Sequence, residues 1–148
     1  MPTEKILVIG SNGQIGSELV EELRNMYSND NVIATDVKEP NAETLTQGPF
    51  YKVDVLDGAA VGDLIRGNKI TQVYLLAALL SATAEQKIKS AWKLNMDGLI
   101  NLLELACEEK FRLFWPSSIA VFGPTTPPTN TPQHTIMEPT TIYGISKL

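Results

Sequence analysis

The chain has little of the chemistry that holds metals or forms disulfides, because its 148 residues include one cysteine and one histidine. A single cysteine excludes an internal disulfide and fits a reducing compartment, so a cytoplasmic protein is expected. Cys107 falls within an apolar helical pattern and is predicted to be a small core residue rather than a nucleophile. His134 lies in a loop rich in threonine and proline with no second ligand nearby, so no metal site is expected.

Long apolar runs and basic clusters are also missing. No apolar stretch reaches the roughly 20 residues of a membrane span, and the N-terminus leads into a strand pattern without the features of a signal peptide. The net charge of −5 argues against nucleic acid as a partner. The remaining composition, 43% hydrophobic and 20% charged, is ordinary for one globular domain, and a small-molecule substrate is the expected partner.

Apolar strand patterns alternate with amphipathic helix patterns along the chain, which predicts a doubly wound parallel sheet in a three-layer α/β/α arrangement. The expected strands are 5–9, 31–36, 50–53, 72–76 and 112–115. The expected helices are 14–26, one capped by Asp57, 84–109 and one capped by Thr140 or Thr141, with loops at 37–49 and 123–139. The predicted buried stripes include Ile15, Leu19, Val20 and Leu23 of the first helix and Trp92, Leu99, Leu102, Leu103 and Ala106 of the long helix.

The first strand runs directly into a glycine-punctuated turn, Gly10-Ser-Asn-Gly13-Gln-Ile-Gly16, and Asp36 follows twenty residues later. Glycines let the backbone approach a pyrophosphate, the following helix directs its free N–H groups at that phosphate, and the acid can accept ribose hydroxyls. A carboxylate at this place favours NAD over NADP. The structural alternatives are a turn that holds nothing and, for Asp36, a solvated turn residue.

A second group of polar residues stands near the other end of the chain. Tyr143 and Lys147 are four residues apart, so they share one face if this segment is helical. A phenol beside a fixed ammonium is typical of a base that accepts a proton from a substrate hydroxyl. Ser117 and Ser118 follow a predicted strand, where open α/β sheets place ligands. Alone, the Tyr–Lys spacing is more often an exposed helix pair.

Taken together, these segments resemble the extended short-chain dehydrogenases/reductases, the NAD-dependent epimerase/dehydratase family. Within that group the chain is most similar to the short-chain L-threonine 3-dehydrogenases. The resemblance covers essentially all of residues 1–148, which are expected to form one NAD-binding Rossmann-type domain. The segments that carry it are the glycine turn, Asp36, Asp54-Val55, Leu76-Ala-Ala-Leu79, Asn95, Pro116-Ser-Ser-Ile-Ala-Val-Phe-Gly123 and Tyr143-Gly-Ile-Ser-Lys147.

The resemblance implies oxidation of the β-hydroxyl of L-threonine to 2-amino-3-oxobutanoate with NAD as cofactor. It implies that Tyr143 is the general base, that Lys147 supports Tyr143 and holds the nicotinamide ribose, and that Asn95 maintains the site. The implied substrate residues are Ser81, Ser117, Ser118 and Tyr143, and Ser118 is counted with Tyr143, Lys147 and Asn95 as catalytic. The implied cofactor residues are Gly10, Asn12, Gly13, Gln14, Ile15, Gly16, Asp36, Asp54, Val55, Leu76, Ala77, Ala78, Asn95, Pro116, Tyr143 and Lys147.

Several alternatives stay open at this point. For Ser81 the structural alternative is a local hydrogen bond at a helix start, for Asp54 a carboxylate at a helix entry, and for Ala77 and Ala78 simple strand packing. A sugar-nucleotide 4-epimerase or dehydratase shares the same residues, and a non-catalytic dinucleotide-binding module is a third possibility. Because family members continue for about as long again, the chain is expected to be the N-terminal half of a longer enzyme, ending before its substrate lobe. The full-length protein is expected to be a homodimer.

Overall fold

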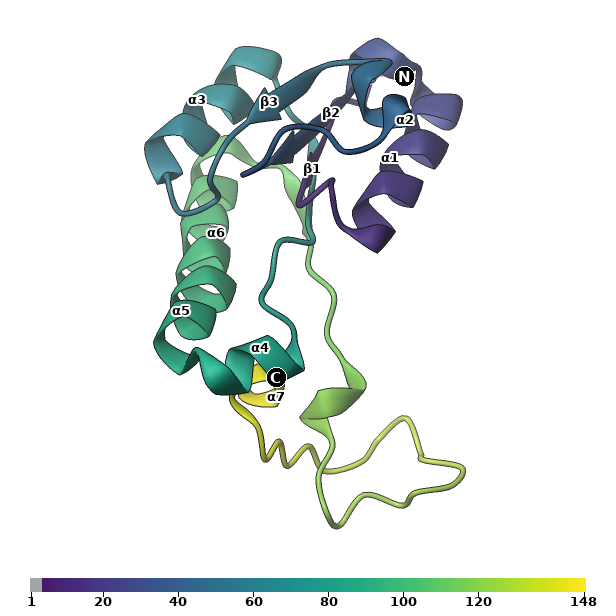
Figure 1. Ribbon diagram of the computed structural model, residues 1–148, viewed down its shortest axis with the longest axis vertical. Coiled ribbons are helices and arrows are strands. Elements are labelled where there is room, and N and C mark those ends of the chain that lie inside the picture. Colours follow the sequence, from purple (N-terminus) through teal and green to yellow (C-terminus); the bar gives the residue numbers. More distant parts are fainter. Residues whose placement is uncertain (1–3) are drawn as a thin grey trace. The chain divides into compact units, whose positions relative to one another are not determined.

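The computed structural model describes residues 4–148, which form two compact units (Figure 1). The sheet unit comprises the chain up to Ala77 together with Asp97–Trp115. The helix–loop unit comprises Ala78–Met96 and Pro116–Leu148. Within the described residues, no helix is both long enough and apolar enough to cross a bilayer.

Five parallel strands form the sheet, in the order β3-β2-β1-β4-β5. Their bounds are β1 Ile6–Ile9, β2 Val32–Asp36, β3 Phe50–Lys52, β4 Gln72–Leu75 and β5 Arg112–Phe114. The chain proceeds from β1 outward to β2 and β3, then crosses to β4 on the other side of β1, so the strand order reverses between β1 and β4. Open α/β sheets bind ligands beyond the carboxyl ends of the strands at such a reversal. The predicted doubly wound fold is confirmed, and among the described residues β3 and β5 lie at the two edges of the sheet.

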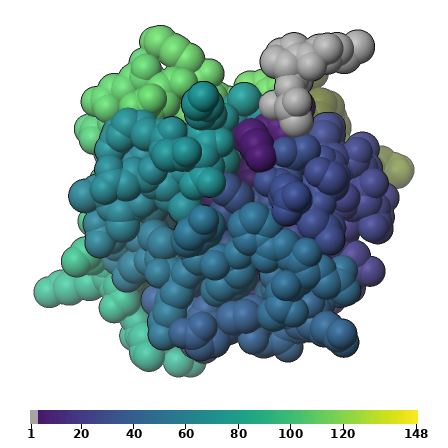
Figure 2. Space-filling view, turned by 90° about the horizontal axis from the view of Figure 1, so that it is seen from above, coloured from purple at the N-terminus to yellow at the C-terminus, as the bar shows by residue number. Residues whose placement is uncertain are grey.

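Helices cover both faces of this sheet, with α1 on one face and α3 and α6 on the other (Figure 1). The bounds are α1 Gln14–Tyr27, a 3₁₀ turn at Asn29–Asn31, α2 Glu43–Thr46, α3 Gly58–Asn68 and α6 Gly98–Glu109. Asp57 caps α3 as predicted, because its carboxylate accepts the Ala60 N–H at 3.0 Å. In the view from above, residues of α1 and of the segment carrying α2 lie side by side on the surface (Figure 2). The α2 turn corrects the prediction that 37–49 is entirely loop.

The core of the sheet unit begins with β1, which is buried along its whole length. Alternate residues of this strand, Ile6 and Val8, pack with Val20 and Leu23 of α1 and with Leu45 of α2. This arrangement follows the period of two in a strand and of 3.6 in a helix. The hydrophobic effect thus fixes α1 across the strands, which places the start of α1 beside the carboxyl end of β1.

One residue of the predicted α1 stripe is on the surface instead. Ile15 is 68% exposed, whereas Leu19 is partly buried against the core. Ile15 lies in the first turn of α1, beyond the carboxyl end of β1, so no strand lies beneath it. The apolar period alone could not show where the sheet ends.

The helix–loop unit contains short helices joined by irregular segments. These are α4 Ser81–Gln86, α5 Ile88–Trp92, a π-helical segment at Lys93–Asp97, a 3₁₀ turn at Ile119–Val121 and α7 Ile142–Ile145. Thr141 caps α7 as predicted, since its hydroxyl accepts the Gly144 N–H at 3.0 Å.

The single helix predicted over 84–109 is wrong, because the backbone departs from α geometry twice. Lys87 has φ −129° and ψ 56°, which separates α4 from α5, and the π segment then widens the helix before α6. A π segment shifts the phase of a helical stripe, so residues before and after it do not continue one stripe. Trp92 and Leu103 are 41% and 48% exposed rather than buried, and Cys107 is exposed rather than a core residue. Leu99 and Leu102 of α6 are buried as predicted.

Arg24 of α1 is a charged residue inside the sheet unit, only 4% exposed. Its guanidinium donates to the carbonyls of Val32 at 3.4 and 3.3 Å, Thr44 at 2.6 Å, Leu45 at 3.1 Å and Pro49 at 3.0 Å. Burial lowers the pKa of this guanidinium from its ordinary value. Because a buried cation needs compensating hydrogen bonds, Arg24 ties α1 to β2 and to both ends of the α2 segment.

Replacing Arg24 by alanine should therefore destabilise the fold. We expect Arg24→Ala to lower the free energy of unfolding by about 3 kcal/mol, since it leaves partly buried carbonyls without donors. The exposed neighbour Asn25 provides the control, and Asn25→Ala should change stability by less than about 0.5 kcal/mol. Chemical denaturation of the two variants measures the difference, and equal losses would contradict the role given to Arg24.

Candidate functional site

The backbone of the turn after β1 lies in direct contact with the backbone at the end of β4. Gly10 has φ +91°, and a Cβ at this position would lie 2.5 Å from the Ala77 nitrogen and 2.9 Å from the Leu76 carbonyl carbon. The Leu76 and Ala77 N–H groups donate to the Ile9 carbonyl at 2.8 and 3.1 Å. Glycine is thus required here both by its left-handed backbone and by the contact. The backbone of Ala77 thus both contacts Gly10 and donates a hydrogen bond to the end of β1.

The third glycine of the turn is required for a related reason. A Cβ on Gly16 would collide with the Gly10 carbonyl oxygen and lie 2.8 Å from the Ser11 Cα. The middle glycine, Gly13, is less constrained, since its Cβ would be 3.3 Å from the same oxygen. The first turn of α1 therefore packs directly on the backbone of the turn, as the sequence spacing predicts.

The start of α1 is open to an anion. Gly13 is the N-cap residue and supplies no side-chain hydrogen bond, and the first turn, which includes Gln14 and Ile15, holds no acidic residue. The first N–H groups of a helix have no partner within the helix and carry partial positive charge. A pyrophosphate is a suitable ligand for such a helix start.

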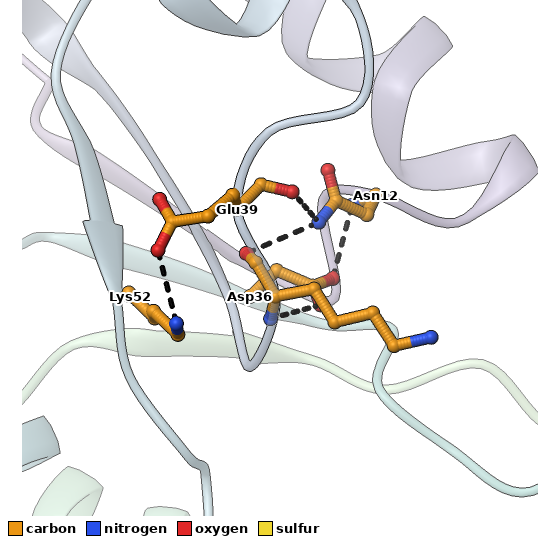
Figure 3. A network of polar contacts seen from close by, with 5 residues as sticks. Asn12, Asp36, Glu39 and Lys52 are labelled. Carbon is orange, nitrogen blue, oxygen red and sulfur yellow. Dashed lines mark hydrogen bonds and ion pairs between the residues drawn. The ribbon is translucent and has the colours of Figure 1, made fainter.

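Asp36 lies at the carboxyl end of β2 and faces the same turn (Figure 3). Its Oδ2 accepts the Asn12 N–H at 3.0 Å and its Oδ1 accepts the Lys38 N–H at 3.2 Å. Each carboxylate oxygen has two lone pairs, so both oxygens keep one for a ligand. The carboxylate is thus already oriented by two backbone donors.

Asp54 and Val55, the next predicted cofactor residues, both have local roles. The Asp54 Oδ1 accepts the Leu56 N–H at 2.9 Å, and its backbone carbonyl accepts the Asp57 N–H at 2.9 Å. Val55 is buried, and a Cβ on Gly98 would be 3.2 Å from the Val55 Cγ1. Asp54 therefore holds the turn that precedes α3, and its contact with a cofactor stays a prediction.

In the helix–loop unit, Lys147 and Tyr143 are neighbours. The Lys147 Nζ lies 6.0 Å from the centre of the Tyr143 ring. Lys147 is only 4% exposed, and burial lowers the pKa of its ammonium. Tyr143 is only partly buried. The pair is therefore not the exposed helix pair that was the structural alternative.

Asn95 joins the pieces of this unit from within the π-helical segment. Its Oδ1 accepts the Leu79 N–H at 2.9 Å, and its Nδ2 donates to the Leu79 carbonyl and to the Ser146 Oγ, both at 3.2 Å. The Ser146 hydroxyl in turn donates to the Tyr143 carbonyl at 2.8 Å. A buried amide with all three bonds made specifies one arrangement of its partners, so Asn95 connects the segment after Ala78 to the helix of Tyr143.

The predicted serines differ in what they contact. Ser117, which follows Pro116, donates to the Lys147 carbonyl at 2.7 Å, and the Ser118 Oγ accepts the Ala120 N–H at 3.2 Å as the cap of a 3₁₀ turn. The Ser81 side chain has no hydrogen-bond partner among residues 4–148. The local hydrogen bond considered for Ser81 is therefore absent from this part of the chain.

Two residues of this unit were not found from the sequence. The Glu85 Oε1 accepts the Tyr143 N–H at 3.3 Å, and Ser146 connects Asn95 to Tyr143. A signal for Ser146 was its place three residues after Tyr143, where a hydroxyl can bond back to a helix carbonyl. Glu85 is 58 residues from Tyr143, and no local pattern connects them.

The sheet order and the glycine turn define a Rossmann-type α/β protein. Residues 6–148 match the NAD dependent epimerase/dehydratase family, and the chain belongs to that family. An uncharacterized epimerase/dehydratase of Staphylococcus saprophyticus is 51% identical over 146 residues, which cover 98% of this chain and 46% of that protein.

Solved structures of similar proteins include L-threonine dehydrogenases. The enzyme from Clostridium difficile has a TM-score of 0.92 at 43% identity and is matched over 97% of this chain and 46% of its own. The GalE-like L-threonine dehydrogenase from Cupriavidus necator, in its holo form, has a TM-score of 0.90 at 50% identity over 96% of this chain and 46% of its own. The chain thus spans about half the length of the relatives it matches.

The contact of Gly16 with the turn gives a prediction for stability. Gly16→Ala should lower the free energy of unfolding by about 2 kcal/mol, because backbone atoms must move apart to admit the methyl group. Gly67→Ala is the matched control in α3: its Cβ would have no neighbour within 4 Å, and alanine stabilises a helix interior by about 0.5–1 kcal/mol. Denaturation curves in which both changes act in the same direction would contradict this account of the turn.

The buried ammonium of Lys147 gives a prediction for pH dependence. Since its pKa is lower in the folded chain than its ordinary value of 10.5, the unfolded chain binds the proton more strongly. Stability should therefore rise with pH between the folded and the unfolded pKa. Lys147→Met should remove this part of the slope, which is measured by denaturing both proteins at about pH 7 and about pH 9.5. Parallel pH profiles would show that Lys147 contributes nothing.

Proposed function

We propose that this chain is the cofactor-binding part of an NAD-dependent dehydrogenase that oxidises the β-hydroxyl of L-threonine. The observation that carries the proposal is the match of the backbone to two L-threonine dehydrogenases at TM-scores of 0.92 and 0.90 and identities of 43% and 50%. In this proposal NAD, when bound, accepts the hydride that leaves the substrate carbon.

The residues of the sheet unit fit the pyrophosphate and the adenosine ribose of this cofactor. Gly10 and Gly16 allow the turn to pack closely on the end of β4 and on the first turn of α1, and the start of α1 has no acid in its first turn to repel an anion. Asp36 has lone pairs for the two ribose hydroxyls, and its negative charge disfavours a 2′-phosphate. These features support NAD over NADP.

The helix–loop unit supplies the groups for proton transfer. In the proposed reaction the Tyr143 oxygen removes the hydroxyl proton as the hydride leaves, so the alcohol becomes a ketone. Lys147 supports the negative charge that forms on the phenol oxygen, since an ammonium near a phenolate stabilises it. Ser118 orients the substrate oxygen, and Ser81, whose hydroxyl has no partner among residues 4–148, contacts the amino acid.

Two other functions compete with this proposal. A sugar-nucleotide 4-epimerase or dehydratase uses the same cofactor and the same Tyr–Lys pair, and the chain's family includes both activities in its name. An assay of free NAD reduction with L-threonine, run beside turnover of a UDP-sugar, separates them. A non-catalytic dinucleotide-binding module is disfavoured because Tyr143 and Lys147 are both present and adjacent.

The role of Tyr143 is tested by removing only its hydroxyl. In a protein that carries this chain at the length of its relatives, Tyr143→Phe should lower threonine-dependent NADH formation by at least about a hundredfold, as expected for loss of a general base. NAD affinity should change less than about twofold, because the ring is retained. Tyr27→Phe, on the exposed end of α1, controls for loss of a phenol elsewhere. Full activity of the Tyr143 variant would exclude the assignment.

A further inference from the structure

The side chain and the backbone of Asn12 form hydrogen bonds with the end of β2 and with the loop that follows it. Its Nδ2 donates to the carbonyls of Lys38 at 3.3 Å and Glu39 at 2.9 Å, and its Oδ1 accepts the Asn41 N–H at 3.1 Å. The Asn41 Nδ2 donates to the Asn12 carbonyl at 3.1 Å. Four hydrogen bonds thus join the glycine turn to the loop, and a fifth, from the Asn12 N–H to Asp36, joins the turn to the end of β2.

The Asp36 carboxylate accepts a backbone N–H from each of the two segments (Figure 3). The Asn12 N–H holds one oxygen and the Lys38 N–H holds the other. Asn41 forms hydrogen bonds with both the side-chain oxygen and the backbone carbonyl of Asn12. It therefore fixes the position of Asn12, whose N–H donates to Asp36. The ion pair of Glu39 with Lys52 at 2.9 Å ties the same loop to β3, but both side chains are exposed and contribute little.

We propose that Asn41 is a positioning residue for the adenosine end of the cofactor and a determinant of the preference for a ribose 2′-hydroxyl over a 2′-phosphate. This inference rests on the proposed binding of NAD. Asn41 acts through Asn12: it holds the turn and the loop in one arrangement, and that arrangement directs the free lone pairs of Asp36.

The hydrogen bonds between Asn12 and Asn41 explain how Asp36 alone, without a second acid, can favour NAD over NADP. If the loop that follows Asp36 could move, the exposed Lys38 ammonium could approach a 2′-phosphate and offset its repulsion by Asp36. With Asn41 bonded to Asn12, the Lys38 carbonyl is held by the Asn12 amide and its N–H by Asp36. The repulsion of a 2′-phosphate by Asp36 therefore cannot be relieved by movement of the loop.

Asn41→Ala tests this role, because alanine removes the side-chain amide that donates to the Asn12 carbonyl and adds no charge. In the 148-residue chain we expect affinity for NAD and for adenosine 5′-monophosphate to fall by about tenfold. Affinity for nicotinamide mononucleotide, which lacks the adenosine, should stay within about twofold, and the preference for NAD over NADP should narrow. Exchange of the Asn12 and Lys38 amide hydrogens, measured without ligand, should accelerate.

Asn31→Ala is the matched control. Asn31 also bonds through its side-chain amide, to the Tyr27 carbonyl at 2.7 Å and the Ser28 Oγ at 3.0 Å, but it precedes β2 instead of following it. We expect this variant to lose comparable stability and to keep the wild-type affinities for NAD and adenosine 5′-monophosphate.

The outcomes separate this proposal from the function on which it rests. If the wild-type chain binds NAD and the Asn41→Ala variant binds it with the same affinity and the same preference over NADP, the role of Asn41 alone is overturned. Equal weakening of adenosine 5′-monophosphate and nicotinamide mononucleotide also overturns it, because the effect is then not confined to the adenosine end. Failure of the wild-type chain to bind NAD overturns both.

Discussion

The close approach of backbone to backbone at the end of β1 is the constraint on which the sheet unit depends. Gly10 lies against the Leu76–Ala77 peptide, and Gly16 lies against the Gly10 carbonyl. Both contacts are too close to leave room for a Cβ atom. This contact fixes where α1 begins relative to β4. It therefore places the open helix start at the point where the strand order reverses, which is the position that a phosphate-binding site requires.

Around this turn, the loops are held by side chains that donate to backbone carbonyls. Arg24 holds the segment that carries α2, and Asn12 holds the loop that carries Lys38 and Glu39. The Arg24 donors are buried or partly buried, and such donors specify a conformation because leaving a buried carbonyl unpaired is costly. The loop between β2 and β3 is thus anchored at both ends, although only Leu45 within α2 is buried.

The sequence allowed the sheet, its order and the glycine turn to be predicted because their signals are local. Apolar runs mark strands, and the glycine spacing marks the turn, so β1, α1 and Asp36 appear where expected. Burial was predicted less well, since Ile15, Trp92, Leu103 and Cys107 are exposed. The exposure of Ile15 depends on where the sheet ends, and the π segment at Lys93–Asp97 interrupts the single helix predicted over 84–109; no apolar period records either feature. The Asn12–Asn41 and Glu85–Tyr143 bonds join residues 29 and 58 positions apart, so no local pattern could reveal them.

The two units differ in what stabilises them, and this difference bears on function. The sheet unit has a continuous apolar core, whereas few hydrophobic residues of the helix–loop unit are buried, among them Ala84, Ala91 and Val121. Its order rests on hydrogen bonds from Asn95, Ser117 and Ser146. A segment with a small apolar core opens at lower free energy than a packed sheet. In the proposed enzyme, the residues that transfer the proton therefore belong to the more adaptable unit.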